Sequence, residues 1–359
     1  MARLGDYVRI RTGKLDANAS SENGRYPFFT CAVEPLRIDS YSYDCECVLV
    51  AGNGDLNVKY YNGKFDAYQR TYIIESIDKS VLSVPYLYFF LDKYVETLRY
   101  EAIGGVIKYI KLGNLTEAQI PLLSLEEQAK VVCEIDKAND LISLRKQQLS
   151  RQDELVKARF VELFGDPVNN SKNLPELTLP ELGEFGRGVS KHRPRNDPKL
   201  LGGEYPLIQT GEVANSELYI TNYENTYSEL GLKQSKMWKS GTLCITIAAN
   251  IAKTAILTFD ACFPDSVVGF KANNKTNNIF IHYWFSFFQA ILEAQAPESA
   301  QKNINLKILS ELKIIVPPIE QQNEFVAFVE QTDKSKLAVQ QSLDKLELLK
   351  KALMQKYFG

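Results

Sequence analysis

Two segments of the chain share a helical pattern of hydrophobic and polar positions. Neither residues 126–164 nor residues 320–358 contain a glycine or a proline, and both are rich in Leu, Lys, Gln and Glu, which favour helices. Positions 135, 142, 149, 156 and 163 read Ile, Ile, Leu, Val and Leu, and positions 325, 332, 339, 346 and 353 read Phe, Thr, Val, Leu and Leu. Columns with a period of seven predict two long helices that pack together as a coiled coil.

The alternative is a pair of independent amphipathic surface helices. A neighbouring column of the first segment is more polar, and it reads Val131, Ala138, Arg145, Gln152 and Arg159. The predicted seam between the two helices is therefore narrow. Start signals precede both helices. In the first, Ser124-x-Glu126-Glu127 follows Pro121 and has the pattern of a capping box. In the second, Pro317-Pro318 is followed by Glu320, whose carboxylate favours a helix N-terminus.

A mixed portion of the chain precedes each long helix. Short β-like runs occur at residues 47–51, 71–75 and 243–247, and they are broken by Gly, Asn and Pro. An aromatic, helix-like stretch follows them at residues 85–99 and again at residues 281–293. The predicted order is therefore mixed domain, long helix, linker, mixed domain, long helix.

The second half of the chain repeats the first. The matches run in one order: Leu4-Gly5 with Leu182-Gly183, Tyr26-Pro27-Phe28-Phe29 with Tyr205-Pro206-Leu207-Ile208, Phe65-Asp66-Ala67 with Phe259-Asp260-Ala261, Lys108-Tyr109-Ile110 with Lys302-Asn303-Ile304, Glu126-Glu127-Gln128 with Glu320-Gln321-Gln322, and Phe164-Gly165 with Phe358-Gly359. The offset is 194 after about residue 115 but 178–179 before residue 30. The second copy therefore carries extra residues, which we place between Thr210 and Gly241.

These patterns predict an α+β protein in which two duplicated mixed domains are separated by two long antiparallel helices that form a coiled coil. The predicted parts are a mixed domain at 1–122, a helix at 123–165, a linker at 166–181, a mixed domain at 182–318 and a helix at 319–359. Each helix would span roughly 58 Å at about 1.5 Å per residue. The copies would be related by an approximate two-fold axis. Because Gly359 matches Gly165, which leads into the second copy, the termini are expected to lie close together.

Composition narrows the possible functions. Lys and Arg number 42 against 44 Asp and Glu, for a net charge of −2, so the positive charge of any nucleic-acid site must be local or shared with a partner. The only histidines, His192 and His282, argue against His-rich metal sites and Ser-His-Asp catalysis. The six cysteines are scattered, as expected for reduced thiols in a cytosol. The first residues lack the apolar region of a signal peptide, and the most apolar stretch, residues 281–292, is too short to span a bilayer and predicts a core helix.

The whole chain resembles the specificity (S) subunits of type I restriction–modification enzymes. The resemblance lies in the duplicated plan, in the Phe-Gly ends of the long helices and in three motifs: Ile120-Pro121-x-x-x-x-Glu126-Glu127-Gln128, Val316-Pro317-Pro318-Ile319-Glu320-Gln321-Gln322 and Tyr205-Pro206-Leu207-Ile208-Gln209-Thr210-Gly211. One departure is Leu123-Ser124, which stands where the second helix start has Pro317-Pro318.

The resemblance implies that each mixed domain is a target recognition domain that reads one half of a split double-stranded DNA sequence. The helices would be spacers that fix the gap between half-sites and dock two methyltransferase (M) subunits. The chain itself would be non-catalytic and cytoplasmic, without a metal site or a membrane partner. S-adenosylmethionine, ATP and Mg would be bound by partner subunits. The complex would methylate adenine and, with restriction (R) subunits, act as an ATP-dependent endonuclease.

The motifs agree with a non-catalytic chain, because neither a G-x-x-x-x-G-K-[ST] phosphate loop nor an Asn/Asp-Pro-Pro-aromatic methyltransferase motif occurs. Two alternatives remain open from the sequence. The chain could be the specificity subunit of a fused methyltransferase–nuclease (type IIB-like) system, or a coiled-coil scaffold that binds no DNA.

Candidate DNA contacts are the Lys, Arg, Asn and Gln residues of loops rich in glycine, because these side chains bind phosphates and base edges. In the first domain they are Arg11, Lys14, Asn53, Lys59, Tyr60, Lys64, Arg70 and Lys108. Glycines such as Gly52 and Gly54 let a backbone approach DNA closely. A plain hairpin turn is the alternative at Asn62-Gly63.

The second domain contains the densest basic run of the chain, residues 187–195. The candidates there are Lys191, His192, Arg193 and Arg195, together with Gln209, Thr210, Asn250, Lys253 and Lys302. A solvated charged loop is the alternative for the run. Asn53 and Asn250 match between the copies, as do Lys108 and Lys302, so these four are expected to support the fold or bind phosphate. His282 is expected to be a core histidine.

Overall fold

The computed structural model describes residues 1–295 and 304–359. Its contacts divide the chain into two units, each of which contains one mixed domain and part of both long helices. Unit 1 comprises Met1–Gln148 and Val339–Gly359, and unit 2 comprises Leu149–Ala338.

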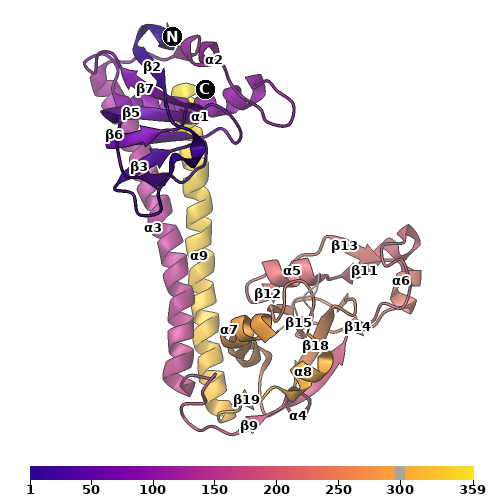
Figure 1. The fold of residues 1–359 in the computed structure, drawn as a ribbon. Coiled ribbons are helices and arrows are strands. Elements are labelled where there is room, and N and C mark those ends of the chain that lie inside the picture. The colour runs from indigo at the N-terminus through magenta and orange to yellow at the C-terminus, as the bar shows by residue number, and fades with distance from the viewer. Residues whose placement is uncertain (296–303) are drawn as a thin grey trace. The chain divides into compact units, whose positions relative to one another are not determined.

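A six-stranded sheet forms the centre of unit 1, with the strand order β2-β7-β5-β6-β3-β4 (Figure 1). The strands are β2 (Val8–Thr12), β3 (Tyr26–Phe29), β4 (Leu36–Ile38), β5 (Tyr43–Ala51), β6 (Val58–Ala67) and β7 (Thr71–Ser76). Neighbouring strands are antiparallel except β3 and β6. α1 (Val84–Glu101) packs on β5 and β6 and buries the face that contains Leu87, Phe90 and Leu91. The remaining elements are β1 (Ala2–Arg3), η1 (Leu4–Asp6), η2 (Ala17–Ala19), α2 (Leu112–Thr116) and β8 (Gln119–Ile120).

Unit 2 contains two larger sheets, of strand orders β10-β18-β15-β16-β12 and β13-β11-β17-β14. The strands of the first sheet are β10 (Gly183–Arg187), β12 (Tyr219–Ile220), β15 (Leu243–Thr246), β16 (Thr254–Leu257) and β18 (Val267–Ala272). The second contains β11 (Leu201–Leu207), β13 (Asn225–Tyr227), β14 (Met237–Trp238) and β17 (Ala261–Cys262). Shorter elements are β9 (Glu176–Leu177), α4 (Leu179–Leu182), η3 (Pro198–Leu200), α5 (Thr210–Asn215), α6 (Glu229–Lys233), α8 (Leu306–Glu311) and β19 (Ile314–Ile315).

The apolar stretch at residues 281–292 lies within α7 (Asn278–Gln295), which packs against β16 and β18. Ile281, Trp284 and Phe285 are fully buried, which confirms the predicted core helix. No helix of residues 1–295 and 304–359 is both long and apolar enough to cross a membrane. All six cysteines are free.

The strand order β2-β7-β5-β6 of unit 1 recurs as β10-β18-β15-β16 in unit 2, with every pair antiparallel, which confirms the duplication. The facing pairs Val8–Ser76 and Val48–Ile74 of unit 1 correspond to the pairs Gly183–Ala272 and Leu243–Phe270 of unit 2.

The predicted match of Leu4-Gly5 with Leu182-Gly183 is wrong by three residues. Ala2 faces Ile120 in unit 1 and Leu177 faces Ile314 in unit 2, and Ile120 and Ile314 match at the offset of 194. Leu4 therefore corresponds to Leu179, which is also fully buried. A repeated Leu-Gly pair is too short a signal to fix an alignment.

The extra residues of the second copy form elements of their own. Between β11 and β15 lie α5, β12, β13, α6 and β14, whereas only β4 lies between β3 and β5. This confirms the insertion predicted between Thr210 and Gly241.

The long helices α3 (Leu125–Phe164) and α9 (Ile319–Phe358) run antiparallel within each unit (Figure 1). In unit 1, the Tyr357 hydroxyl donates to Glu134 at 2.7 Å and Lys146 pairs with Glu347 at 3.1 Å. In unit 2, Lys336 pairs with Asp153. The residue number in α9 falls as the number in α3 rises, as an antiparallel pair requires.

The prediction of a narrow seam is wrong. The polar residues of the neighbouring column bond to the other helix instead of facing solvent: Arg145 donates to Ser342 at 3.2 Å, Gln152 to Ser335 at 2.8 Å and Arg159 to Glu324 at 2.6 Å. The interface between the two helices therefore contains two columns of α3 residues. The column through Ile135 is hydrophobic, and the column through Val131 is polar at Arg145, Gln152 and Arg159. Sequence patterning missed the second column because it counted only hydrophobic side chains.

Aromatic side chains join α3 to the core of unit 2. Phe160 is fully buried, and its ring centroid lies 4.9–5.3 Å from those of Phe164, Phe280, Phe287 and Phe325. These contacts connect α3, α7 and α9 in one cluster, so the helix pair and the mixed domain share a hydrophobic core.

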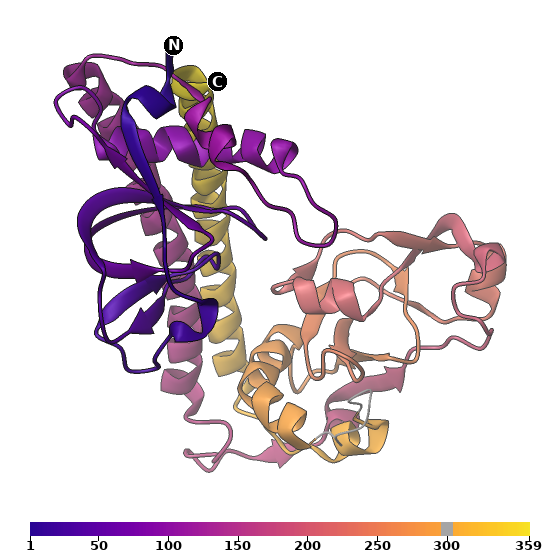
Figure 2. The same cartoon turned by 45° about the horizontal axis from the view of Figure 1, so that its top comes forward.

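The start of α3 and the chain termini agree with the sequence. Ser124 and Glu127 form a capping box, in which the Ser124 N–H donates to the Glu127 carboxylate at 2.9 Å and the Glu127 N–H donates to Ser124 Oγ at 3.3 Å. Ala2 and Phe358 pack against the same core of unit 1, and the ring centroids of Phe358 and Tyr86 are 5.1 Å apart. This confirms that the termini lie close together (Figure 2).

Candidate nucleic-acid interface

One end of the unit 1 sheet brings together candidates that are far apart in the sequence. β2 and β5 end there, and β6 and β7 begin there. The loops at this end contain Lys14, Asn53, Arg70 and Lys108. Backbone hydrogen bonds connect the loops: Gly52 N–H donates to the Arg70 carbonyl at 2.8 Å, and Gly54 N–H donates to the Lys108 carbonyl at 2.9 Å. We call this surface the unit 1 loop end.

Lys59 lies beside this end, at the second residue of β6. Its ammonium donates to Asn57 Oδ1, and burial lowers the pKa of Lys59. Its side chain is half-buried, so the charge is presented to solvent less freely than that of Lys14 or Arg70.

Three other candidates lie on the body of the sheet and already have partners. Arg11 pairs with Glu75. Tyr60 donates to Glu46 at 2.8 Å, and burial together with this carboxylate raises the pKa of Tyr60 to about 12. The Lys64 ammonium lies 4.7 Å from the centroid of the Tyr41 ring. Arg11, Tyr60 and Lys64 lie in strands, outside the loops of the unit 1 loop end, and their side chains already have partners within unit 1.

Sequence reasoning missed a hydrophobic loop at this end, between α1 and α2. Ile103 and Tyr109 exchange backbone hydrogen bonds of 3.0 and 2.9 Å, and the residues between them form a projecting tip (Figures 1 and 2). Val106 is fully exposed and Ile107 is 63% exposed. The signal was the sequence Gly104-Gly105-Val106-Ile107, in which two glycines precede two apolar residues outside any periodic pattern.

The matching end of the first unit 2 sheet gathers the candidates of the second domain. β10 and β15 end there, and β16 and β18 begin there. The loop after β15 contains Asn250 and Lys253, both exposed, and the basic run follows β10. Asn53 and Asn250 both lie in the loop after the equivalent strand, as their match in the sequence predicts. Lys302 lies outside the described residues.

Two of the four Lys and Arg residues in the basic run, and its histidine, have an acidic partner inside unit 2. Arg193 and Arg195 both pair with Asp265, and His192 Nε2 lies 3.1 Å from the Asp197 carboxylate. No acidic group of the described residues lies within ion-pair distance of Lys191. The run is therefore less available to phosphates than its sequence indicates, and Lys191 is an exposed cation of the run without an acidic partner among the described residues.

A pocket of about 360 Å³ lies between the basic run and β11. Arg195, Gln209 and Thr210 line it together, so three candidates from two segments meet at one place. The Ser190 hydroxyl, which also lines the pocket, is buried and has no hydrogen-bond partner among the described residues.

Two equivalent glutamines join each mixed domain to a long helix, and sequence reasoning missed their role. Gln128 is fully buried, donates to the carbonyls of Val81 (2.7 Å) and Leu123 (2.9 Å), and accepts from the Ser83 N–H (2.9 Å).

In unit 2, Gln322 donates to the carbonyls of Lys275 (3.0 Å) and Pro317 (2.8 Å) and accepts from the Thr276 hydroxyl (2.9 Å). The sequence did contain an indication of this role. Glu126-Glu127-Gln128 repeats as Glu320-Gln321-Gln322, and both triplets end in glutamine.

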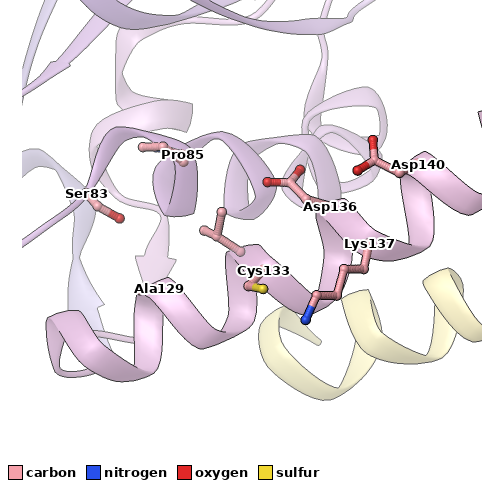
Figure 3. A pocket seen from close by; sticks show the side chains of 8 residues that line it. Ser83, Pro85, Ala129, Cys133, Asp136, Lys137 and Asp140 are labelled. Carbon is pink, nitrogen blue, oxygen red and sulfur yellow. The ribbon is translucent and has the colours of Figure 1, made fainter.

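A separate hollow of about 520 Å³ lies where the start of α1 meets α3 (Figure 3). Pro85, Ala129 and Cys133 form an apolar part of its lining, and Asp136 and Asp140 add carboxylates. It lies on a face of α3 other than the seam with α9, and no candidate DNA contact lines it.

The described residues contain no group of three His, Cys, Asp or Glu that could hold a metal ion. His282 Nδ1 lies 2.9 Å from the Thr254 hydroxyl, and burial lowers the pKa of His282 to about 4. This agrees with the expected core histidine.

Comparisons with known proteins give a consistent result. A family model described as the type I restriction modification DNA specificity domain matches residues 1–151 and 176–348. The chain is 28% identical over 396 residues to the type I restriction enzyme EcoDI specificity subunit of Escherichia coli, covering 99% of this chain and 86% of that protein.

Two solved structures have the same fold. The S subunit of a type I restriction–modification system from M. genitalium covers 100% of this chain and 95% of its own, with a TM-score of 0.62 and 16% identity. The second is a chain from a structure described as "Structural basis underlying complex assembly and conformational transition of the type I R-M system". The match covers 99% of the present chain and 96% of that chain, with a TM-score of 0.63 and 18% identity.

Proposed function

Because the chain belongs to the family of type I restriction–modification DNA specificity subunits, we propose that each mixed domain reads one half of a bipartite double-stranded DNA sequence. The observation that supports this most directly is the repeated strand order, which places candidate contacts at the same end of both sheets. The matching ends differ in their loops, as two readers of different half-sites require.

The long helices set the distance between the two half-sites in this proposal. Each has 40 residues, and their polar and hydrophobic columns pair in one antiparallel register. A heptad-based pair keeps the same seam when it is lengthened or shortened by whole heptads.

The specificity subunit has no catalytic activity of its own. We propose that two methyltransferase subunits dock on the helices, and that the hollow beside Cys133 is part of that surface because it combines an apolar lining with exposed carboxylates. S-adenosylmethionine, ATP and Mg would then be bound by the methyltransferase and restriction subunits, and the complex would act in the cytoplasm.

A matched deletion of one heptad from each helix tests the proposal. Deletion of residues 144–150 of α3 and residues 337–343 of α9 removes the Arg145–Ser342 contact as a pair and keeps Gln152–Ser335. Each helix shortens by about 10 Å, which corresponds to roughly three base pairs. Single-molecule sequencing of modified adenines, in strains that carry the methyltransferase genes with either version of this chain, should show the same half-sites separated by a shorter gap.

Two results would contradict the proposal. One is a changed half-site with an unchanged gap. The other is a pattern of modified adenines that does not depend on this chain at all, which is the outcome that a coiled-coil scaffold without DNA binding predicts.

A further inference from the structure

The loop at residues 103–109 lies between α1 and α2 at the unit 1 loop end. Its tip exposes Val106 completely and Ile107 by 63%, although apolar side chains of this size favour burial. Tyr100, at the end of α1, is 92% exposed beside it. Exposed apolar residues that gather on one loop mark a surface that another molecule covers.

The base of this loop is held firmly. Ile103 and Tyr109 are paired through both backbone hydrogen bonds, and Gly54 N–H donates to the Lys108 carbonyl. Arg99, near the end of α1, donates to the Leu56 carbonyl at 2.8 Å. A tip on such a base can be pressed against a surface without losing its position.

The cations beside the loop favour DNA as the molecule that covers it, and the neighbouring Asp55 carboxylate already lies 3.6 Å from the Arg99 guanidinium. Lys108 follows the tip directly, and the loop is joined by hydrogen bonds to the unit 1 loop end, which also contains Lys14 and Arg70. Cations beside an apolar tip fit the phosphates that flank a base step, and a protein surface of neutral character would gain nothing from them.

We propose that the Val106–Ile107 tip is a wedge that inserts between base pairs of duplex DNA and kinks it, while Lys108 binds the adjacent phosphate. The inference rests on the proposed function, since it assigns a contact to the domain that reads the first half-site. Insertion buries the two side chains against base faces, and the kink brings more of the unit 1 loop end against the backbone.

Salt dependence separates the wedge from a phosphate contact. Apolar insertion releases no counterions, so Val106→Ala with Ile107→Ala should weaken binding by roughly tenfold or more and leave the slope of log K against log salt unchanged. Lys108→Ala should instead lower the magnitude of the slope by about 1. Ile77→Ala is the matched control, because Ile77 is 62% exposed in unit 1 and follows β7 at the other end of the sheet.

The experiment uses the full chain assembled with its methyltransferase subunits and a duplex that contains its modified motif, labelled at both ends for energy transfer. The wild-type complex and Ile77→Ala should shorten the end-to-end distance of the duplex, and the double variant should not. Unchanged affinity and unchanged bending in the double variant would overturn the wedge while leaving the proposed function intact. Loss of methyltransferase binding with normal bending would overturn it too, since the tip would then be a protein contact. Absence of specific binding by the wild-type complex would count against the proposed function itself.

Discussion

Replacement of Gln322 by alanine should destabilise unit 2, because this side chain joins the start of α9 to the mixed domain. Its amide donates to the carbonyls of Lys275 and Pro317, and its carbonyl accepts from the Thr276 hydroxyl. Gln322 is fully buried and Thr276 is 4% exposed, so water reaches neither freely.

The expected cost follows from the groups that lose a partner. Two backbone carbonyls and one hydroxyl lose their partner, and of these the Pro317 carbonyl and the Thr276 hydroxyl bond within the buried interior. Each unpaired buried group costs about 1–3 kcal/mol, so a loss of about 3 kcal/mol is expected from these two. With a urea m-value of about 2–3 kcal/mol/M, the midpoint of unfolding should fall by roughly 1–1.5 M.

Tryptophan fluorescence is a selective assay, because both tryptophans, Trp238 and Trp284, are buried in unit 2. Urea unfolding followed by fluorescence should show the shift for Gln322→Ala and almost none for Gln321→Ala, which removes an exposed neighbour on the same helix. Equal midpoints for the two variants would refute the anchoring role of Gln322.

Gln322→Glu adds a chemical test of the same contacts. A carboxylate would face the two carbonyl oxygens that the amide now binds, so the folded state should favour the protonated acid and raise its pKa. The stability of this variant should therefore decrease as the pH rises above about 4.3, the ordinary pKa of glutamate. Gln322→Ala should show no such pH dependence relative to wild type.

Three more predictions follow from buried and charged groups. Burial lowers the pKa of His282 from 6.5 to about 4, so the fold favours the neutral ring. Unit 2 should lose about 3 kcal/mol as the pH falls from 6.5 to 4, and His282→Gln should abolish this loss in fluorescence-monitored unfolding. Phe160→Ala should cost about 3–5 kcal/mol in the same assay, whereas Val161→Ala, at an exposed position, should change stability by less than about 0.5 kcal/mol. Lys191→Ala should lower the salt slope of DNA binding by about 1, and Arg195→Ala should lower it less, because its guanidinium is already paired; equal effects would show that the pairing does not persist on DNA.

The sequence predicts those parts of the fold that local patterns determine. Both long helices appear within one residue of the Gly- and Pro-free segments, since residues 126–164 and 320–358 are observed as Leu125–Phe164 and Ile319–Phe358. The capping box at Ser124 and the core helix around Trp284 follow from short-range spacing in the same way.

Long-range contacts were less predictable. The match of Leu4 with Leu182 is displaced by three residues, because strand pairing and not residue identity fixes which positions are equivalent. The polar column through Gln152 was read as a weak part of the seam, although its members bond across the helices. Whether a polar side chain on a helix faces solvent or a partner depends on the facing residue, which the pattern of one helix does not contain.

The candidate DNA contacts also fall into two groups, those that lie in loops without an ion pair among the described residues and those that are already ion-paired. Loop residues such as Lys14, Asn53 and Arg70 meet at one sheet end, because strand register brings the ends of distant strands together. Arg11 and Arg195 are ion-paired, and nothing in the local sequence marks Glu75 or Asp265 as their partners. Residue type predicts what a side chain can bind, and the fold decides whether it is already bound.

The two copies within this chain show which features the architecture requires and which can vary. Strand order and the buried glutamine are the same in both, and each involves backbone groups that would be left unpaired by a change. The segment between β11 and β15 differs most from its counterpart. It forms five elements where the first copy has only β4, and the order of the shared strands is unchanged. If this segment and the loops at the sheet ends read the DNA, recognition can diverge between the copies without disturbing the contacts that hold each mixed domain to its helix. Gln209→Ala with Thr210→Ala changes the pocket beside the basic run and leaves the buried residues of this segment, such as Ile220 and Trp238, in place. This variant should keep its fold and its half-site gap while changing the bases of one half-site, as sequencing of modified adenines would show. A change in both half-sites would mean that reading depends on the shared framework instead.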